Sequence, residues 1–444
     1  MATLKQTLAL TLAAAALLSF TACGGNTASS SSSSSSAPQV GSRDATLRFS
    51  WWGGDSRNKA TLDVIKQFET KYPKIKIEAE YGSSDGYNDK LATQLSAGTA
   101  PDIVQMDPAF FPTYMKTNPN YFVDFNSQKI DLSGFDAEYL KGNGNYEGKQ
   151  FGLPTGTAGW ALIVNSDLAS KIGVDLTKPY TFDDLLAMGA KVKAYDKDAY
   201  LLGANLSTLS DELFRPYLMQ LTGNLVLDDS TKTLGVTKEQ IAEALTLIKK
   251  LYDNGVIPPE SHTSAYAKDN LPKDPNWISG KYVAAYCVAS TINVMAAANK
   301  NANYTAGMLP IMKNAKNDGY IASTPQLMLV TQKSQYQPEA VAFLDYFFND
   351  REAAKTLGIQ RSIPAVKSAR EVCLENNLID KLTNDSVTFL LSYNGKNESG
   401  LSTASQAKSI YEDTISAVAF GKKDPATAAA DMVALLNNFL ATKK

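Results

Sequence analysis

Leu47-Arg48-Phe49-Ser50-Trp51 opens the stretch that decides the fold, residues 46–107. Apolar and polar side chains alternate in it, which is typical of a β-strand, and Gly53-Gly54 closes it. A helical pattern follows from residue 58 to residue 72, because apolar residues recur there every three or four positions. These residues are Leu62, Ile65, Phe68 and Tyr72. Pro73 then ends the helix.

The same alternation of strand and helix continues to residue 107. Residues 74–79 alternate again, with Ile75, Ile77 and Ala79 on one side. A second helix follows, marked by Tyr87, Leu91 and Leu95, and Gly98 suits its C-terminal cap. Residues 101–106 form a third predicted strand. Strands that are separated by helices pair in parallel, so the sequence predicts a doubly wound α/β sheet.

The rest of the chain is mainly helical after one more apolar run at residues 151–166. Apolar stripes predict helices near residues 241–251 and 338–348, and Asp424-Pro425 is a favourable start for a closing helix through Leu440. A chain of 444 residues is long enough for two or three domains. No Pro- or Ser-rich linker divides the body, so the chain is expected to cross between two domains more than once.

Composition excludes several classes of function. The apolar and charged fractions, 44% and 20%, argue against wholesale disorder and against a polytopic membrane protein. A net charge of -2 makes nucleic acid a poor partner. The one histidine, His262, is expected in a loop and not in a catalytic triad or zinc site. Cys287 and Cys373 are expected to be buried small hydrophobes.

Two common motifs of catalytic or metal sites are incomplete in this sequence. Gly148-Lys149 lacks the first glycine and the final Ser or Thr of a phosphate-binding loop, and Asp228-Asp229 lacks the spacing of a calcium loop. A glycosidase remains open, because it needs only two suitably spaced carboxylates.

The first forty residues resemble an export signal sequence followed by a linker. Lys5 precedes an apolar run, Leu8 to Phe20, which has the length of a signal-peptide core. Phe20-Thr21-Ala22-Cys23 resembles a bacterial lipobox, although the usual Leu is replaced by Phe20. This predicts a signal peptide over residues 1–22, a lipid on Cys23 and a Ser-rich tether over residues 23–43. The alternative is an ordinary secretory signal with a chance cysteine.

Short motifs spread over the body carry a family resemblance. In chain order they are Trp51-Trp52-Gly53-Gly54-Asp55-Ser56-Arg57, Phe68-Glu69-x-x-Tyr72-Pro73-x-Ile75, Tyr87-x-x-Lys90-Leu91, Ala97-Gly98-x-x-Pro101-Asp102-Ile103, Gly152-Leu153-Pro154 with Asn165, Phe182-Asp183-Asp184-Leu185, Ser279-Gly280-Lys281 and Gln360-Arg361-x-x-Pro364-Ala365. In order and spacing they resemble the bacterial extracellular solute-binding proteins of family 1, the maltose-binding-protein-like receptors of carbohydrate ABC importers. Each motif is short, and together they indicate the family and not one sugar.

The resemblance implies a two-lobed, periplasmic-binding-protein-like fold of class II. Each lobe is then a sheet flanked by helices, with the ligand in a cleft between the lobes. Residues 44–154 and 312–361 would form lobe 1, and residues 155–311 and 362–444 would form lobe 2.

A sugar site combines aromatic rings, which stack on the C–H faces of the sugar, with polar side chains that pair with its hydroxyl groups. Ligands of open parallel sheets also bind at the carboxyl ends of the strands. Trp52 is preferred over Trp51 as the ligand-facing indole, because adjacent strand residues face opposite ways. Salt bridges, helix caps and interior packing are the alternative roles for the candidates. The candidate ligand-binding residues are Trp52, Asp55, Arg57, Asp85, Tyr87, Asp107, Trp160, Trp277 and Arg361.

The expected function is a lipid-anchored receptor that is not an enzyme. It would be a monomer without metal or cofactor. It would bind a carbohydrate, with an oligosaccharide favoured, and deliver it to ABC permease subunits. The Ser-rich tether favours the outer face of a Gram-positive cytoplasmic membrane. The alternatives are a cell-surface carbohydrate-active enzyme, a glycan adhesin without a role in transport, and a receptor for a non-sugar solute such as ferric iron or a peptide.

Overall fold

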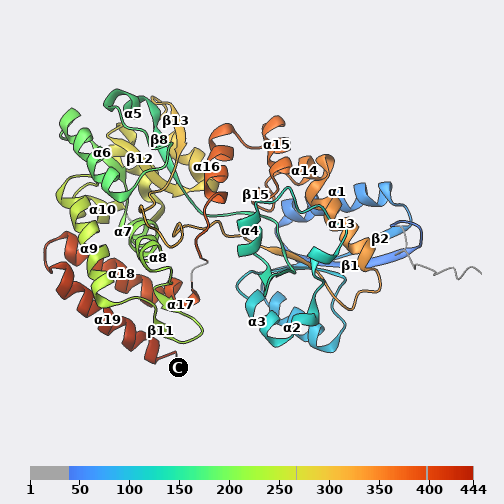
Figure 1. The fold of residues 1–444 in the computed structure, drawn as a ribbon. Coiled ribbons are helices and arrows are strands. Elements are labelled where there is room, and N and C mark those ends of the chain that lie inside the picture. Colours follow the sequence, from blue (N-terminus) through green and yellow to red (C-terminus); the bar gives the residue numbers. More distant parts are fainter. Residues whose placement is uncertain (1–39, 267, 397–398, 444) are drawn as a thin grey trace, which may run out of the picture. The chain divides into compact units, whose positions relative to one another are not determined.

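The computed structural model describes residues 40–266, 268–396 and 399–443. The predicted signal peptide, the lipidation of Cys23 and most of the predicted tether lie outside these residues. The described body contains two main β-sheets, each covered by helices, as shown in Figure 1. The expected α/β architecture with two helix-flanked sheets is therefore confirmed.

The first sheet has five strands in the order β2-β1-β3-β14-β6. The strands are β1 (Ala45–Trp52), β2 (Ile75–Gly82), β3 (Ile103–Met106), β6 (Leu153–Pro154) and β14 (Leu327–Val330). Strand β1 pairs in parallel with β2 and with β3, as the alternation of strands and helices predicts. Strand β14 comes from much later in the chain and pairs antiparallel with β3 and β6.

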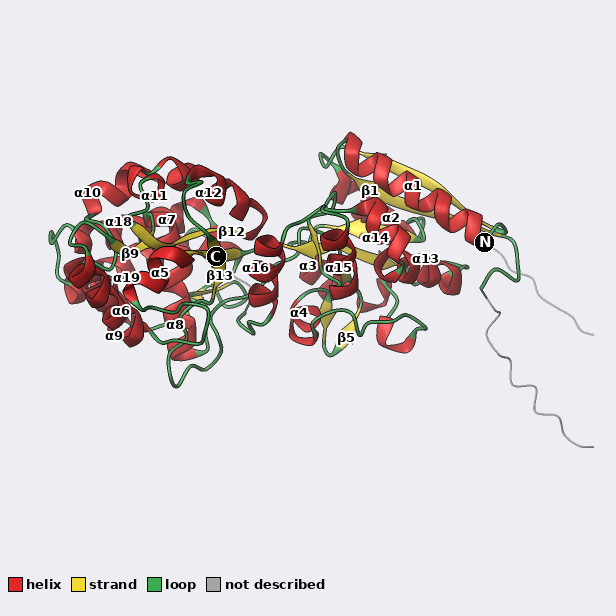
Figure 2. Ribbon diagram, turned by 90° about the horizontal axis from the view of Figure 1, so that it is seen from above, coloured by secondary structure: helices red, strands yellow, loops and turns green. Residues whose placement is uncertain are grey.

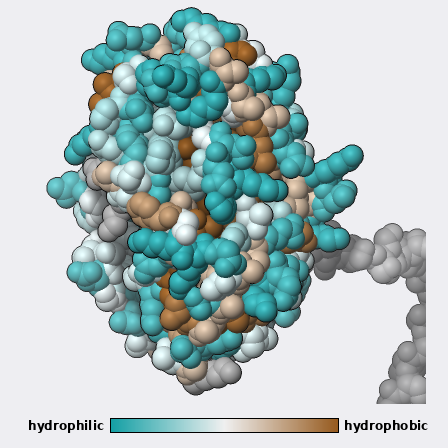
Figure 3. Space-filling view, turned by 90° about the vertical axis from the view of Figure 1, so that its left-hand side faces the viewer, coloured by the Kyte–Doolittle hydropathy of each residue, from teal (hydrophilic) through white to brown (hydrophobic). Residues whose placement is uncertain are grey.

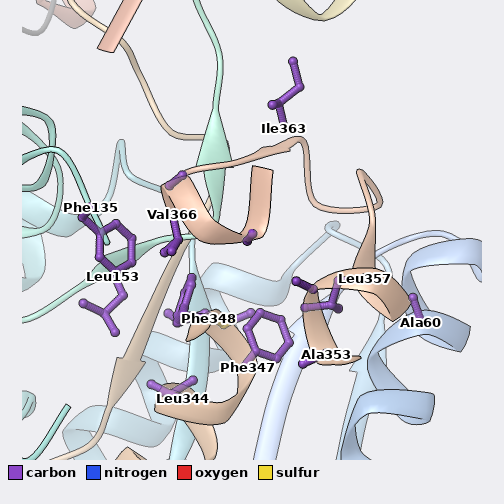
Figure 4. Packing of buried hydrophobic residues seen from close by; sticks show 14 of the residues in the cluster. Ala60, Phe135, Leu153, Leu344, Phe347, Phe348, Ala353, Leu357, Ile363 and Val366 are labelled. Carbon is purple, nitrogen blue, oxygen red and sulfur yellow. The ribbon is translucent and has the colours of Figure 1, made fainter. Parts of the chain in front are cut away.

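Helices cover both faces of this sheet. They are α1 (Asp55–Lys71), α2 (Tyr87–Ala97), α3 (Phe111–Thr117), α4 (Ala137–Gly142), α13 (Gln337–Asn349), α14 (Arg351–Leu357) and α15 (Lys367–Glu375). Helix α1 buries Val64 and Phe68 in a core that it shares with α13, whereas α2 buries Leu91 and Leu95 in a separate core with α3. Figure 4 shows how side chains of α13 gather with Leu153 of β6, Leu357 of α14 and Val366.

The second sheet has four strands in the order β13-β8-β12-β9. The strands are β8 (Trp160–Asn165), β9 (Tyr200–Gly203), β12 (Tyr282–Val288) and β13 (Tyr304–Gly307). Its helices are α5 (Ser166–Ile172), α6 (Phe182–Tyr195), α7 (Leu206–Leu209), α8 (Arg215–Thr222), α9 (Lys238–Asp253), α10 (Glu260–Thr263), α11 (Pro275–Ile278), α12 (Ile292–Ala298), α16 (Lys381–Leu391), α17 (Gly400–Thr403), α18 (Ser405–Ala419) and α19 (Pro425–Ala441). Figure 2 shows them around the strands.

Three of the predicted helices are present with their expected ends. Helices α9 and α13 contain the apolar stripes, and the side chain of Asp424 accepts hydrogen bonds from the first turn of α19. The outward face of the helices around the second sheet is largely hydrophilic, with hydrophobic residues scattered among polar ones, as Figure 3 shows. Within the described ranges, no helix combines the length and the apolar character that crossing a membrane requires.

Two segments, residues 155–159 and 321–326, carry the chain between the two sheets, and residues 361–365 lie beside them. The third passage follows α15 and leads to α16, which packs on β8 and β13. Strands β7 (Gly156–Thr157) and β15 (Ile363–Pro364) pair antiparallel, and Ala158 and Ser323 exchange backbone hydrogen bonds of 2.8 Å. Ser362 next to β15 has a φ of 80°, which a non-glycine residue adopts only under constraint. These paired segments, residues 155–159, 321–326 and 361–365, are called the hinge below. Helix α15, which follows the hinge, packs on α14 and α13.

Gly156 is expected to be required for hinge packing. A Cβ atom at this position would lie 2.7 Å from the Arg361 carbonyl oxygen and 2.8 Å from that of Ile363. Replacing Gly156 by alanine is therefore expected to lower the free energy of unfolding by about 1–3 kcal/mol, as other overpacked sites do. Urea unfolding measures this. Gly82→Ala is the control, because a Cβ there meets nothing within 4 Å; equal stability of the two variants would contradict the prediction.

The loop predicted for His262 is wrong, since the residue lies in the one-turn helix α10. Its Nε2 atom is 3.0 Å from both carboxylate oxygens of Asp274, which also caps α11 and accepts a hydrogen bond from the Tyr282 hydroxyl. The histidine therefore ties α10 to α11. The expected burial of Cys287 and Cys373 is confirmed, and the two thiols are free.

Candidate functional site

The carboxyl ends of β1 and β2 border two neighbouring pockets. The first, called the Arg57 pocket, has a volume of about 420 Å³. It is lined by Trp52, Gly53, Gly54, Ser56, Arg57, Gly82, Ser83, Ser84 and Gln360. The second, called the Tyr87 pocket, has a volume of about 270 Å³. It is lined by Ser50, Trp51, Glu80, Tyr81, Gly82, Ser83, Asp85, Gly86, Tyr87 and Lys90.

Two aromatic side chains meet between these pockets. Trp52 is half-buried, and its ring centroid is 4.9 Å from that of Tyr87. The Tyr87 hydroxyl donates a 3.0 Å hydrogen bond to the Ser50 carbonyl, and burial raises the pKa of this phenol, so it stays neutral at ordinary pH. Trp51 is fully buried, as predicted, and its Nε1 donates to the Asn58 side chain at 2.9 Å.

Trp160 stands at the start of β8, directly after the hinge, and lines two pockets of the second sheet. The charged pocket, about 290 Å³, is lined by Gly159, Trp160, Asp211, Glu212, Arg215, Pro216, Leu309, Gly319, Tyr320, Ile321, Ser323, Leu390, Lys396, Thr403 and Lys408. The apolar pocket, about 420 Å³, is lined by Trp160, Asn205, Thr208, Leu271, Pro272, Tyr286, Cys287, Val288, Thr291, Val294 and Met295. The indole is therefore shared between a polar and an apolar surface.

A π-helical turn, Ser210–Phe214, supplies the acidic side of the charged pocket. Asp211 forms ion pairs with Arg215 and, at 3.6 Å, with the Lys408 ammonium group. Glu212 is buried beside them, and its carbonyl accepts a 3.1 Å hydrogen bond from the Tyr320 hydroxyl. Single π-helical turns inside helices often occur at functional sites. The sequence analysis missed these charged residues, because they look like the solvated face of an ordinary helix.

The structure places the other predicted residues at the edges of the first-sheet site. Asp55 is the exposed first residue of α1, and it does not line the Arg57 pocket. Asp85 is exposed and lines the Tyr87 pocket. Asp107 is half-buried after β3, and its carboxylate accepts a 2.9 Å hydrogen bond from the Ala109 N–H. This bond belongs to the turn before α3, whose N-cap is Phe110, so Asp107 does not cap the helix.

Two of the predicted ligand residues have buried side chains. Trp277 is 1% exposed, and its Nε1 donates a 2.8 Å hydrogen bond to the Met295 carbonyl, so its ring is part of the core. Arg361 is 3% exposed and hydrogen-bonds to the side chains of Gln105 and Thr61 inside the first lobe. Neither side chain lines the four pockets described above, and Arg361 lines a smaller pocket of about 30 Å³ beside Phe347 and Ser362.

The pockets present aromatic rings, charged side chains and hydrogen-bonding groups. Across the residues that the structure describes, no three His, Cys, Asp or Glu side chains come together to hold a metal ion. Burial raises the pKa of Cys287 to about 12 and that of Cys373 to about 11, so both are protonated thiols at neutral pH.

Comparison with known proteins agrees with this fold. The solved structure of an extracellular solute-binding protein family 1 member from Alicyclobacillus acidocaldarius has a TM-score of 0.79 at 24% identity, covering 90% of this chain and 99% of that one. A periplasmic oligogalacturonide binding protein from Yersinia enterocolitica has a TM-score of 0.71 at 26% identity, covering 89% of this chain and 99% of that one.

A curated relative is similar over a shorter stretch. The diacetylchitobiose binding protein DasA of Streptomyces coelicolor is 27% identical over 155 residues, which are 34% of this chain and 35% of DasA. The bacterial extracellular solute-binding protein family itself matches residues 63–385, well over half of the 444 residues. The chain therefore belongs to the bacterial extracellular solute-binding protein family.

Proposed function

We propose that this protein is the receptor of an ABC importer and that it binds an oligosaccharide without cleaving it. The position of Trp160 carries this proposal, because one indole borders both the charged pocket and the apolar pocket. A sugar ring has C–H-rich faces for the indole and hydroxyl groups for the charged side chains. Two pockets on either side of one ring suit a ligand of at least two sugar units.

The relatives support a carbohydrate as the ligand class. The named ligands of the two relatives with a stated specificity are oligogalacturonide and diacetylchitobiose, and both are short chains of sugar units. These sugars differ in charge and in substituents. The relatives therefore support the class of ligand and leave the individual sugar to experiment.

The ligand is proposed to contact both sheets. Trp52, Arg57, Asp85 and Tyr87 would act from the first lobe, with Asp55 and Asp107 at the rim. Trp160 and Asp211 would act from the second lobe. The paired hinge segments permit one lobe to turn against the other, and a ligand that touches both favours the closed form. We propose that residues 44–154 and 312–375 form lobe 1 and that residues 155–311 and 376–444 form lobe 2. This moves α15 from the expected lobe 2 to lobe 1, because α15 packs on α14 and α13.

The cellular setting is proposed from the leader sequence. A diacylglyceryl group on Cys23 would hold the protein to the outer face of the cytoplasmic membrane, and the Ser-rich tether favours a Gram-positive cell. The permease subunits would recognise the closed, liganded form. Radiolabelled palmitate incorporation that is lost in Cys23→Ser tests the anchor.

A screen of mono- and oligosaccharides by thermal shift, with analysis of the products, tests the function. The expected result is a rise in melting temperature with at least one oligosaccharide and no released sugar. Released sugar identifies the alternative, a carbohydrate-active enzyme. Stabilisation by peptides or ferric iron, with none by sugars, overturns the carbohydrate proposal.

A further inference from the structure

Two arginines lie together beside the Arg57 pocket and are joined by neutral groups. Arg57 donates to the Trp52 carbonyl at 3.3 Å, and the same carbonyl accepts from Gln105 at 3.2 Å. Gln105 in turn accepts a hydrogen bond from Arg361. On the other side, Arg361 donates to the Thr61 hydroxyl at 2.9 Å, and this hydroxyl donates to the Arg57 carbonyl at 2.8 Å.

No carboxylate balances either charge within the described part of the chain. Arg57 bonds only to the carbonyls of Trp52 and Gln360, and Arg361 bonds only to an amide and a hydroxyl. Burial lowers the pKa of Arg57. Burial, with the neighbouring Arg57 charge as a smaller cause, lowers the pKa of Arg361 to about 9. Both remain charged at neutral pH, and a buried charge without a counter-ion is costly.

The pocket in front of these arginines is itself free of acidic side chains. Among the described residues that line it, Arg57 is the one charged group, accompanied by Ser56, Ser83 and Ser84. The pocket also meets the start of the 17-residue helix α1, whose N-cap Gly54 provides no side-chain cap. The positive end of the helix dipole therefore adds to the two guanidinium groups.

The acidic residues of the adjoining Tyr87 pocket and of the start of α1 lie outside the lining of the Arg57 pocket. Glu80 and Asp85 line the Tyr87 pocket; Glu80 is paired with Arg48 at 2.6 Å, and Asp85 is exposed. Asp55 follows Gly54 but is exposed and outside the pocket lining. Its carboxylate offsets part of the positive potential through solvent, so removing the charge of Asp55 provides a second variant for the test.

We propose that the Arg57 pocket binds the anionic group of an acidic sugar unit, so that the preferred ligands are oligosaccharides carrying a carboxylate or a sulfate ester. This rests on the proposed function and names its substrate class. The guanidinium of Arg57 forms the charge-assisted hydrogen bonds with the anion, and the serine hydroxyls donate to its remaining oxygens. Arg361 is a positioning residue: it raises the local potential and holds Arg57 through Gln105 and Thr61.

The test uses matched di- to tetrasaccharides in isothermal titration calorimetry. Galacturonate, glucuronate and mannuronate oligomers are compared with the corresponding galactose, glucose and mannose oligomers, and sulfated galactose oligomers form a third arm. In the series that binds, the acidic form is expected to bind about 10- to 100-fold more tightly than the neutral form. A preference for the uronate over the sulfated form assigns the group as a carboxylate, and the reverse assigns a sulfate ester.

Variants of the pocket residues then test whether Arg57 causes the preference for acidic over neutral sugars. Arg57→Gln is expected to lower the affinity for the acidic oligomer about 10-fold more than the affinity for the neutral oligomer, and circular dichroism checks that the variant is folded. Arg57→Lys is expected to keep part of the preference, and Asp55→Asn to increase it. The control is Lys59→Gln, an exposed cation on the same helix, which leaves the preference unchanged.

The outcomes separate the two proposals. Equal binding of acidic and neutral sugars, or an equal loss of both in Arg57→Gln, overturns the anionic subsite and leaves the carbohydrate receptor standing. Failure of every sugar to bind overturns both.

Discussion

Replacing Trp277 by alanine is expected to lower the free energy of unfolding by about 3–5 kcal/mol, the usual cost of deleting a buried indole. The ring is 1% exposed, lies 5.4 Å from the ring of Tyr304, and donates a hydrogen bond to the Met295 carbonyl. The alanine variant leaves both a cavity and an unpaired buried carbonyl. Urea unfolding followed by circular dichroism measures the change.

The control separates a core residue from a ligand contact. Trp277→Phe fills most of the cavity and lacks only the Nε1 hydrogen bond, so it is expected to recover a large part of the lost stability. In conditions where Trp277→Ala is folded, its sugar affinity is expected to equal that of the unchanged protein. A variant with unchanged stability and lost binding would restore Trp277 as a ligand residue.

The fold could be predicted where the local pattern and the tertiary structure agree. Residues 46–107 carry alternation, helix periodicity and a cap at Gly98, and the structure has the predicted strands and helices there, with Gly98 in a left-handed conformation. The partners of β3 could not be predicted in the same way. Strand β14 is supplied from more than 200 residues away in the chain, and a short buried run has no signal for its neighbour.

The site was harder to predict, because burial depends on tertiary packing. Trp277 follows Asn276 and precedes Ser279-Gly280, so its surroundings in sequence are polar although its side chain is in the core. Arg361 ends a segment expected to cross between the two domains, and this position predicted a ligand contact. The sequence has no signal for the amide and hydroxyl partners that hold its buried side chain. Asp211 and Arg215 could not be predicted as pocket residues, because their spacing is typical of an exposed ion pair on a helix. The π-helical turn that places them at a pocket has no sequence signature.

The second large effect is expected at Trp160. Trp160→Ala is expected to weaken oligosaccharide binding by about 30- to 100-fold, the range for an aromatic hot spot, because the indole is the surface common to the charged and apolar pockets. The ring is half-buried and not part of the sealed core, so the urea midpoint is expected to fall far less than in Trp277→Ala. Calorimetry with the sugar that gives the largest thermal shift measures the affinity.

Two controls separate the loss of ring stacking from a general change in the shape of the pockets: the variant Trp160→Phe, and a comparison of ligands of different length. Phenylalanine keeps a ring above the sugar face, so the variant is expected to retain more affinity than Trp160→Ala. Because the indole borders two pockets, its loss is expected to reduce the advantage of a disaccharide over a monosaccharide, whereas loss of a residue in one pocket reduces the affinity for both. An equal loss for both ligand lengths would mean that Trp160 serves one subsite and that the charged and apolar pockets do not hold consecutive sugar units.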